Sequence, residues 1–404
     1  MAIGPRILLS ATTAWYFPVI PGSHGMVRAV NCQADCPMKR LILVGGGHAH
    51  LSVLEALARE KPPGVEVVLV TPFRFQIYSG MLPGWMAGHY EKAECRIDLE
   101  PLVESAHVRL LAQRVVAISA DQRHIQLTDG SLIEYDFLSL DVGSGIDLSS
   151  LQPAGKKLLP VRPLDEFFEA WPAILSAARD KPGFRLVVVG GGAGGVELAL
   201  AAQYAFTRSG IAGRVDLVAS ASSLLSGHAL GVQRRVLRFM AKANVNVHCL
   251  DGVGTEAGVL LSDGRLLPAD SVIAATGACA PRWIESSGLK LDANGYVAVD
   301  AYNCSTSHAN VFAAGDVSAR QDIAVARSGV HAVHSGPVLA ANLLAALSGG
   351  SMRTYRPRRR SLYLLTCGPR YAIASWGAWS AEGKWVWWWK DRIDRGFIKR
   401  FNFR

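Results

Sequence analysis

An apolar run that leads directly into closely spaced glycines stands at the centre of this chain. The run is Leu186–Val189, and the glycines that follow it are Gly190, Gly192 and Gly195. Residues rich in Ala and Leu come next, with Glu197 among the first of them. The pattern predicts a buried strand, a tight turn and a helix that begins at the turn. Glycines at this spacing let the amides of a helix start approach a pyrophosphate, so we expect a dinucleotide site.

The same order of elements begins 145 positions earlier in the chain. Leu41–Val44 is apolar, and Gly45 and Gly47 follow it. His50 takes the place of the third glycine, so this copy departs from the glycine fingerprint. We expect its helix over about 51–59. Two such loops in one chain predict two nucleotides, a bound flavin dinucleotide and an exchangeable nicotinamide dinucleotide.

Alternating apolar and polar residues follow each glycine unit. They occupy 106–142 in the first unit and 245–277 in the second, and each stretch holds an Asp-Gly dipeptide typical of a hairpin turn. We therefore expect a small antiparallel meander in each unit, with 107–111 and 245–249 as strands of it. The two units together predict an α/β fold in which a whole domain is repeated.

Two further segments predict parts of a nucleotide site. Tyr78–Gly84 is rich in Gly and Pro, and we expect a loop that crosses toward the flavin ring. Val311–Ala314 predicts a buried strand that delivers Asp316 at a glycine-loosened end. A long helix of small residues is expected after it, over about 324–347.

The composition is that of a globular α/β protein. The chain has 404 residues, of which 50% are hydrophobic and 19% charged, enough for two or three domains. No run of about 18 uncharged apolar residues occurs, so we expect no membrane-spanning helix. Seven cysteines, without a C-x-x-C or C-x-x-x-x-C pair beside either glycine loop, do not resemble a secreted disulfide framework. A reducing cytoplasm is expected.

The positive charge is confined to the C-terminus. The formal net charge is +9, and residues 353–404 hold 13 Lys and Arg against 3 Asp and Glu, so the remainder sums to −1. Trp385 and Trp387–Trp389 lie between these cations, as in segments that attach to a bilayer interface. Two interpretations stay open: peripheral attachment to the inner face of a membrane, with access to quinone, or a subdomain whose tryptophans cover the flavin site or a homodimer face. Nucleic-acid binding is not expected.

Residues 1–38 lack the pattern of a folded segment. Pro18, Pro21 and Gly22 interrupt the short apolar stretch after Met1, and no clean cleavage site follows. We expect a disordered N-terminal extension or a misplaced start rather than a working signal peptide. Met38 stands directly before the first strand, where a natural start would fall.

At these residues the sequence resembles the flavoproteins with two dinucleotide-binding domains, the superfamily of pyridine nucleotide-disulfide oxidoreductases. The segments that carry the resemblance are Gly45–His50, Gly190–Glu197, Thr276–Gly277 and Val311–Asp316. Within the superfamily the chain is similar to type II NADH:quinone oxidoreductases, and most of all to the NADH-dehydrogenase-like proteins also found fused to selenide, water dikinase. The segments that resemble this group's own pattern are Thr71–Pro72, Tyr78–Gly84 and Ala372–Gly377.

The resemblance implies two Rossmann-like domains, the second inserted in the first. We expect an FAD domain over 39–155 and 286–350, an NAD(P) domain over 156–285, and a basic, Trp-rich C-terminal subdomain over 351–404. The cofactor-binding residues that the resemblance implies are Gly45, Gly47, His48, Ala49, Thr71, Pro72, Ser79, Met81, Leu82, Pro83, Val115, Val142, Gly143, Ser144, Gly190, Gly192, Ala193, Gly194, Gly195, Glu197, Thr276, Gly277, Gly315, Asp316, Arg327, Ser328 and Gly329.

The acid that usually ends the second strand of a dinucleotide unit is absent from both units. Thr71 takes its place in the first unit and Ala219 in the second. Without this acid a 2′-phosphate is not repelled, and no arginine directly follows to select it. The nicotinamide cofactor can therefore be NAD or NADP.

The implied reaction passes a hydride from nicotinamide to flavin and then electrons to a quinone-like acceptor. Glu197 is the candidate catalytic residue, and the alternative is a helix-surface acid that suits the helix dipole. A second hypothesis is a sulfide:quinone or sulfur- or selenium-linked reductase that uses Cys367, with Cys279 as another candidate. A flavin-bound scaffold without turnover is the third. His48 and His50 lie in the pyrophosphate loop without further ligands, so no metal is expected.

Overall fold

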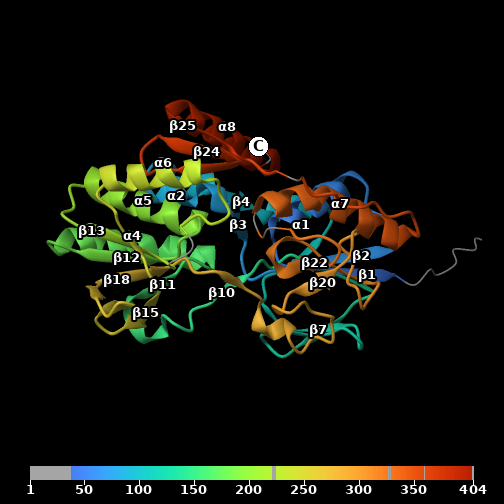
Figure 1. Ribbon diagram of the computed structural model, residues 1–404. Helices are drawn as coiled ribbons and strands as arrows, with labels where there is room; N and C mark the ends of the chain where they lie inside the picture. Colours follow the sequence, from blue (N-terminus) through green and yellow to red (C-terminus); the bar gives the residue numbers. More distant parts are fainter. Residues whose placement is uncertain (1–37, 221–223, 326, 328, 359, 403–404) are drawn as a thin grey trace, which may run out of the picture. The chain divides into compact units, whose positions relative to one another are not determined.

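Two five-stranded parallel sheets organise the part of the chain that the computed structural model describes, residues 38–402 without 221–223, 326, 328 and 359 (Figure 1). In spatial order the first sheet consists of β21 (Val311–Ala313), β9 (Phe137–Leu140), β1 (Lys39–Val44), β2 (Val65–Val70) and β5 (Arg109–Leu111). The second sheet consists of β11 (Leu158–Pro160), β18 (Ser271–Ala274), β12 (Arg185–Val189), β13 (Arg214–Ala219) and β14 (Asn246–Cys249). The predicted repeat of an α/β unit is confirmed. The expected N-terminal extension lies outside the described residues, apart from Met38.

Smaller antiparallel sheets accompany the parallel ones. They are β6 (Val115–Ser119), β7 (His124–Leu127) and β8 (Leu132–Glu134); β15 (Gly252–Thr255), β16 (Gly258–Leu261) and β17 (Leu266–Pro268); and β23 (Tyr363–Thr366), β24 (Ala372–Trp376) and β25 (Trp379–Gly383). Two two-stranded pairs are also antiparallel, β3 (Phe75–Ile77) with β4 (Arg96–Asp98) and β10 (Gly145–Ile146) with β19 (Ala278–Cys279). A third pair, β20 (Val297–Val299) with β22 (Ser318–Arg320), is parallel.

The α-helices are α1 (His48–Arg59), α2 (Leu82–Met86), α3 (Leu99–Ser105), α4 (Leu164–Asp180), α5 (Ala193–Arg208), α6 (Leu230–Lys242), α7 (Gly329–Ser348) and α8 (Lys384–Phe401). Short 3₁₀ turns lie at Ser79–Met81, Lys92–Cys95, Gln152–Lys157, Arg282–Ile284 and Gly315–Val317.

Alternation along the strands divides each unit into layers. Leu41 and Leu43 of β1 belong to a core shared with α1 and α7, whereas Ile42 and Val44 pack with the β6-β7-β8 sheet. Successive side chains of a strand point to opposite faces, so each parallel sheet is covered by helices on one side and by a small sheet on the other. The second unit repeats this arrangement, with the β15-β16-β17 sheet in the second position.

Several local predictions were wrong in detail. Helix α1 begins at His48 and α7 at Gly329, where we expected 51 and about 324. The segments expected to join the meanders are instead β5 and β14, edge strands of the parallel sheets. A period-two pattern does not distinguish these two arrangements.

The segment Tyr78–Gly84 was expected to be a loop, but it contains a 3₁₀ turn and the start of α2. Pro83 lies in the first turn of α2, where its missing N–H costs nothing. Trp85 stacks on Phe168 with ring centroids 3.9 Å apart, which anchors this short helix by packing.

Helix α7 has the length and composition of a segment that could cross a membrane, with a mean hydropathy of 1.3. It packs closely against α1, however. A Cβ at Gly336 would lie 2.8 Å from Ser52 Oγ and 3.1 Å from Ala49 Cα. Close packing through small residues of this kind is typical of the core helix of a globular unit.

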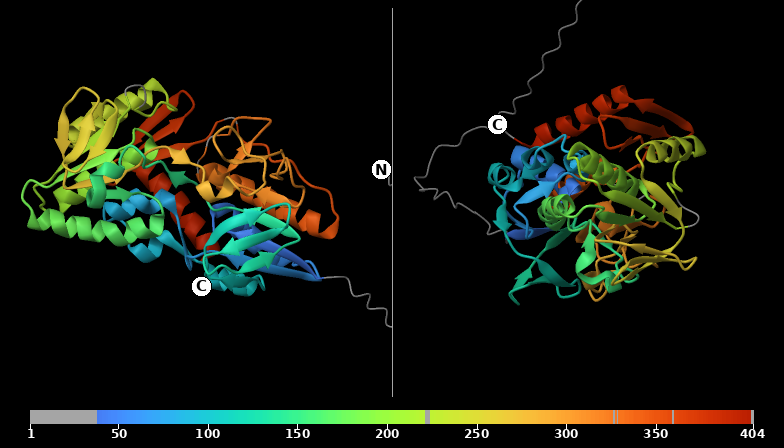
Figure 2. Two further views of the ribbon diagram at one scale, coloured as in Figure 1. Left: turned by 90° about the horizontal axis from the view of Figure 1, so that it is seen from below. Right: turned by 90° about the vertical axis from the view of Figure 1, so that its left-hand side faces the viewer.

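The C-terminal segment connects to both parallel-sheet units (Figures 1 and 2). Arg238 of α6 donates to Glu382 of β25 at 2.6 Å, on the side of the second unit. Lys390 of α8 donates to the Gly80 carbonyl at 2.6 Å, on the side of the first unit. These contacts place α8 and its sheet against both nucleotide units.

Candidate functional site

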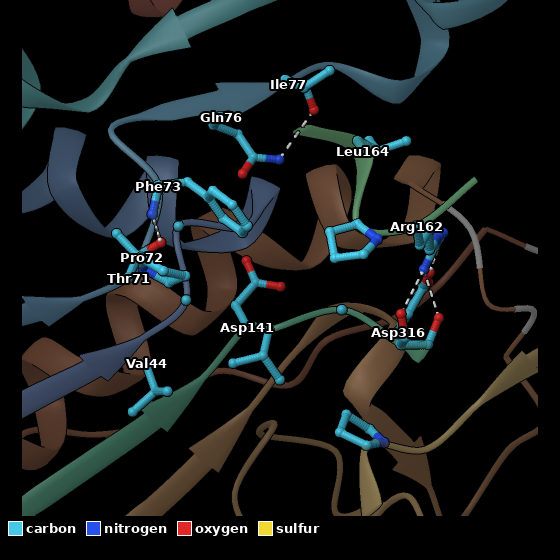
Figure 3. Close-up of a pocket in the computed structure, with 18 of the residues that line it drawn as sticks. Val44, Thr71, Pro72, Phe73, Gln76, Ile77, Asp141, Arg162, Leu164 and Asp316 are labelled. Atoms are coloured by element: carbon cyan, nitrogen blue, oxygen red, sulfur yellow. Dashed lines mark hydrogen bonds and ion pairs between the residues drawn. The ribbon is translucent and has the colours of Figure 1, made fainter. Parts of the chain in front are cut away.

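The carboxyl ends of the first sheet meet at one edge, because the register of the strands aligns them. Val44 of β1 lies opposite Val70 of β2 and Leu140 of β9, and Leu140 lies opposite Ala313 of β21. The residues that follow these strand ends therefore gather at one place, where open α/β sheets bind their ligands. A cavity of about 370 Å³ lies there (Figure 3).

Close backbone contacts explain the first two glycines of this cradle. A Cβ at Gly45 would lie 2.5 Å from the Asp141 carbonyl oxygen, and one at Gly47 would lie 2.4 Å from Asp141 Cγ. Gly45 also has a φ of +89°, which side chains disfavour. The loop can pass under the neighbouring strand end only without side chains at these two positions.

His50, which stands where the fingerprint has its third glycine, is fully buried and contacts the glycine loop and strand β9. Its Nδ1 lies 2.6 Å from the Gly45 carbonyl oxygen, and its Nε2 lies 2.8 Å from Ser139 Oγ. Burial lowers the pKa of His50 to about 4, so the ring is neutral. The carbonyl can only accept, so Nδ1 carries the proton and Nε2 accepts from Ser139.

Asp141 directly follows β9, and its carboxylate covers the start of α1. Its Oδ2 accepts from the backbone amides of Ala49 at 2.7 Å and His50 at 3.0 Å. Asp141 is 3% exposed. Burial, opposed by these two hydrogen bonds, raises the pKa of Asp141 to about 7. A carboxylate that the sequence analysis did not single out therefore occupies the first turn of this helix.

His48 lines the same cavity as a buried, neutral ring. Burial lowers its pKa to about 4. Its Nε2 is buried and lacks a hydrogen-bond partner among the described residues. A buried polar atom without a partner indicates a ligand or water that supplies one.

Asp316 forms an ion pair with Arg162 on the opposite wall of the cavity (Figure 3). The distance from Arg162 Nη2 to Asp316 Oδ2 is 3.1 Å, and Arg162 Nη1 donates to Ser144 Oγ at 2.6 Å. Figure 3 shows Asp141 between this pair and the Thr71–Phe73 turn. Arg162 is a second site residue that the sequence analysis missed.

The structure brings most of the predicted flavin-site residues together. Those that line the cavity are Gly45, Gly47, His48, Thr71, Pro72, Ser79, Val115, Val142, Gly143, Ser144, Asp316 and Gly329. Gly315 and Arg327 line a neighbouring cavity of about 240 Å³ that shares Asp316. Ser328 lies outside the described residues. The predicted residues of the first unit that do not line this cavity are Ala49, Met81, Leu82 and Pro83.

The second cradle has the standard glycine geometry. A Cβ at Gly190 would lie 2.1 Å from the Ala275 carbonyl oxygen, and one at Gly195 would lie 1.9 Å from the Gly190 carbonyl oxygen. Gly192 and Gly194 have open space around them and are exposed, at the start of α5, which begins at Ala193. Amides at this helix start are free to face a pyrophosphate.

The end of β18 closes this second cradle. Thr276, which follows that strand, donates to the Asp147 carbonyl at 2.7 Å, and Gly277 next to it is exposed. Together with the glycine loop, these residues form the edge at which the second sheet would bind a nucleotide.

Glu197 lies partly buried in the first turns of α5. Its Oε1 accepts from the Thr366 amide at 2.8 Å and from Thr366 Oγ1 at 2.9 Å, so it is not an acid free on a helix surface. Burial raises the pKa of Glu197, and the nearby Lys390 opposes this. Lys390 itself donates to Asp394 at 2.5 Å, and Tyr78 donates to the same carboxylate at 3.2 Å. Helix α8 therefore places a buried cation between α5 and the Tyr78 segment.

The first cavity suits a flavin dinucleotide. It offers a glycine cradle that no Cβ could enter, the amides of a helix start, an unpartnered buried ring nitrogen and the Asp316 carboxylate. The glycine loop would hold the pyrophosphate, and Asp316 would hold hydroxyl groups of the ribityl chain. Two parallel sheets, each with such a cradle, define a flavoprotein oxidoreductase that uses FAD and NAD(P)H.

The comparisons identify the family. A model of the pyridine nucleotide-disulphide oxidoreductase family matches residues 39–336, and the chain belongs to this family. The ferredoxin–NAD(+) reductase component of the biphenyl dioxygenase system of Paraburkholderia xenovorans is 32% identical over 53% of this chain and 52% of its own length. This chain thus spans about half of that relative. An NADH dehydrogenase-like protein of Mycobacterium tuberculosis is 28% identical over 70% of this chain and 73% of its own length.

A solved structure supports the fold. NDH2 of Plasmodium falciparum, in complex with NADH, aligns with a TM-score of 0.76 at 14% identity, over 90% of this chain and 97% of that one. The fold agrees with the family match, which makes the chain an FAD- and NAD(P)H-dependent oxidoreductase.

The close approach of Gly195 to the Gly190 carbonyl can be tested by its effect on stability and on flavin reduction. Gly195→Ala would place a Cβ 1.9 Å from the Gly190 carbonyl oxygen. Helix α5 would therefore have to shift away from β12. We expect a lower midpoint of thermal unfolding and a marked loss of flavin reduction by NAD(P)H, with the FAD spectrum retained. Gly194→Ala is the matched control, because nothing lies within 4 Å of a Cβ at that position. Alanine in a helix stabilises the folded protein by up to about 1 kcal/mol relative to glycine. Equal stability of the two variants would contradict this account.

Proposed function

We propose that this oxidoreductase passes electrons from NAD(P)H, through FAD, to a quinone-like acceptor at a membrane surface. A bound flavin supplies the ring system that can accept a hydride from the nicotinamide. The observation that carries the proposal is the two-sided construction of helix α8. One side of this helix closes over Glu197 and the Tyr78 segment, and the other presents tryptophans to solvent.

The outward side of α8 is apolar and aromatic. Trp385, Trp388 and Trp389 are 55%, 56% and 39% exposed, and Ile393 is 44% exposed. Trp385 stacks on Trp389 with ring centroids 6.4 Å apart. Exposed tryptophans grouped in this way are typical of an interaction surface rather than of a solvated helix.

Cations accompany these tryptophans. Lys384 and Arg392 are exposed on the same helix, and no carboxylate of the described residues forms an ion pair with either. Indole rings at headgroup level beside unpaired cations favour an anionic lipid surface. We propose peripheral attachment to the inner face of the membrane from the cytoplasm.

Glu197 is the proposed residue at the meeting point of nicotinamide and flavin. It lies in the first turns of α5, which begins at the nicotinamide cradle, and its pKa is affected by Lys390, which also holds the Gly80 carbonyl. The Tyr78 segment contacts the flavin cavity through Ser79. These contacts support a role for the carboxylate between the two cofactor sites, where it would influence the charge near the flavin.

The acceptor is tested by reoxidation of the reduced flavin. Purified protein loaded with FAD should lose its absorbance near 450 nm with NADH or NADPH, and a soluble ubiquinone or menaquinone analogue should restore it. The panel should include a [2Fe–2S] ferredoxin, because relatives bear the name of ferredoxin reductases. Reoxidation by ferredoxin but by no quinone would overturn the proposal. Normal reduction without reoxidation by any acceptor would favour a scaffold.

The membrane surface is tested by binding to vesicles. Replacing Trp385, Trp388 and Trp389 together by Ser should weaken partition onto anionic vesicles of phosphatidylglycerol and phosphatidylcholine at least about tenfold, the effect of roughly 1.4 kcal/mol. The matched control is Leu132→Ser with Leu266→Ser, because these exposed leucines lie on the small sheets. Binding that both variants retain equally, or that is absent from the unaltered protein, would contradict the assignment.

Cys367 is a poor candidate for a reactive thiol. It is 1% exposed, and burial, followed by the charge of Glu197, raises its pKa far above the ordinary value. A thiolate is the reactive form, so this environment disfavours attack. We expect Cys367→Ser to keep flavin reduction and quinone turnover within about twofold of the unaltered enzyme, a change of only ~0.4 kcal/mol. Loss of turnover with normal flavin reduction would support the sulfur-linked hypothesis instead.

A further inference from the structure

The two nucleotide units have equivalent strand pairings, so their residues can be compared position by position. Val44 lies opposite Leu140 in the first sheet, as Val189 lies opposite Ala274 in the second. The residues that follow β9 and β18 are therefore equivalent, and they are Asp141 and Ala275.

The two units differ at positions that touch one another. In the second unit an ideal Cβ on Gly195 would lie 3.5 Å from the Ala275 Cβ, with no charged group between helix and strand. In the first unit the equivalent residues are His50 and Asp141, and the His50 amide donates to Asp141 Oδ2 at 3.0 Å. The first cradle thus carries a carboxylate where the second carries a methyl group.

This carboxylate uses part of the anion-binding capacity of α1. Asp141 accepts from the amides of Ala49 and His50, which belong to the first turn of the helix. It lines the same cavity as Gly45 and Gly47. A helix start that binds a pyrophosphate would then face two anions at once, its own carboxylate and the ligand.

The groups that face Asp141 do not neutralise it. Asp316, which follows β21, adds a like charge. His48 and His50 of α1 are neutral rings, because burial lowers the pKa of each to about 4. Arg162 lies across the cavity, but its guanidinium pairs with Asp316. Burial is the main reason that the pKa of Asp141 rises to about 7, so this acid titrates within the physiological range.

We propose that Asp141 makes flavin binding proton-linked, so that the protein takes up one proton on this side chain when the dinucleotide binds. The pyrophosphate brings negative charge next to a buried carboxylate, and protonation removes the repulsion. The protonated acid still accepts from the two amides through its unprotonated oxygen. The proposal rests on FAD as cofactor and not on the identity of the electron acceptor.

The direction of the effect follows from linkage. The flavin complex holds the Asp141 proton more tightly than the free protein does, so affinity is highest below pH 7. From about pH 8 upward the dissociation constant rises about tenfold per pH unit until the pKa of the complex is reached, as expected for one linked proton. Flavin retention therefore weakens as the surroundings become alkaline.

The test is calorimetry of FAD binding to the flavin-free full chain at pH 8. Titration in phosphate and in Tris, which differ in ionisation enthalpy, gives the number of protons taken up. We expect close to one proton for the unaltered protein and close to none for Asp141→Asn, which keeps an oxygen that accepts from both amides. Half of the free protein is already deprotonated at pH 7, so the dissociation constant should rise about fivefold from pH 7 to pH 8 in the former and stay constant in the latter.

Two control variants identify the group that takes up the proton. His48→Gln removes a ring that could itself take up a proton when the flavin binds. Asp165→Asn removes another carboxyl that lines the cavity, and burial raises the pKa of that carboxyl to about 6. Each should take up the same number of protons per FAD bound as the unaltered protein, even where its affinity for FAD is lower. No uptake by the unaltered protein, or uptake that Asp141→Asn keeps, overturns the proposal, and uptake lost in one of the controls identifies the group that takes up the proton instead. Should Asp141→Asn fail to fold, the proton count of the unaltered protein and of the two controls still decides.

Discussion

The location of the site depends on one steric constraint, the contact between a strand-end carbonyl and the first glycine of the neighbouring loop. A Cβ at Gly190 would lie 2.1 Å from the Ala275 carbonyl oxygen, and one at Gly45 would lie 2.5 Å from that of Asp141. These contacts fix where each loop turns. They therefore also fix where the following helix begins and where its unpaired amides point. Both cofactor sites, and the helix α8 that spans them, are arranged around these two helix starts.

This constraint explains why the sequence alone could predict the two glycine loops and their helix starts. An apolar run followed by Gly-x-Gly predicts a strand, a turn and a helix start, and both units have this order. Asp141 and Arg162 were missed, because their roles depend on contacts across the fold. Asp141 follows an ordinary buried strand, and only the pairing of β9 with β1 brings it to the helix start. Arg162 meets Asp316 across 154 positions of sequence, with no local pattern to signal it.

The C-terminal helix shows a different limit of sequence analysis. Trp387 and Trp388 are neighbours, yet Trp387 is 3% exposed and stacks on Tyr90, whereas Trp388 is 56% exposed. Successive residues of an α-helix point about 100° apart, so one aromatic run serves both a core and a surface. Composition therefore could not choose between a cover for the flavin site and an interaction surface. The described helix has a face suited to each, and the domain boundaries drawn from the sequence stay predictions.

The departure of the first unit from the glycine fingerprint is compensated within the fold. A side chain at Gly195 would meet the Gly190 carbonyl, but at the equivalent position the His50 ring forms a hydrogen bond with the Gly45 carbonyl at 2.6 Å. An imidazole there requires more room between helix and strand than the second unit leaves. The Asp141 carboxylate occupies part of that room and satisfies the amides of the helix start. Replacing either residue alone by alanine would leave buried polar groups without partners, at a cost of about 1–3 kcal/mol each. His50 and Asp141 therefore act together. Where the second unit packs Gly195 closely against Ala275, the first unit has a histidine and a buried acid beside the proposed flavin site.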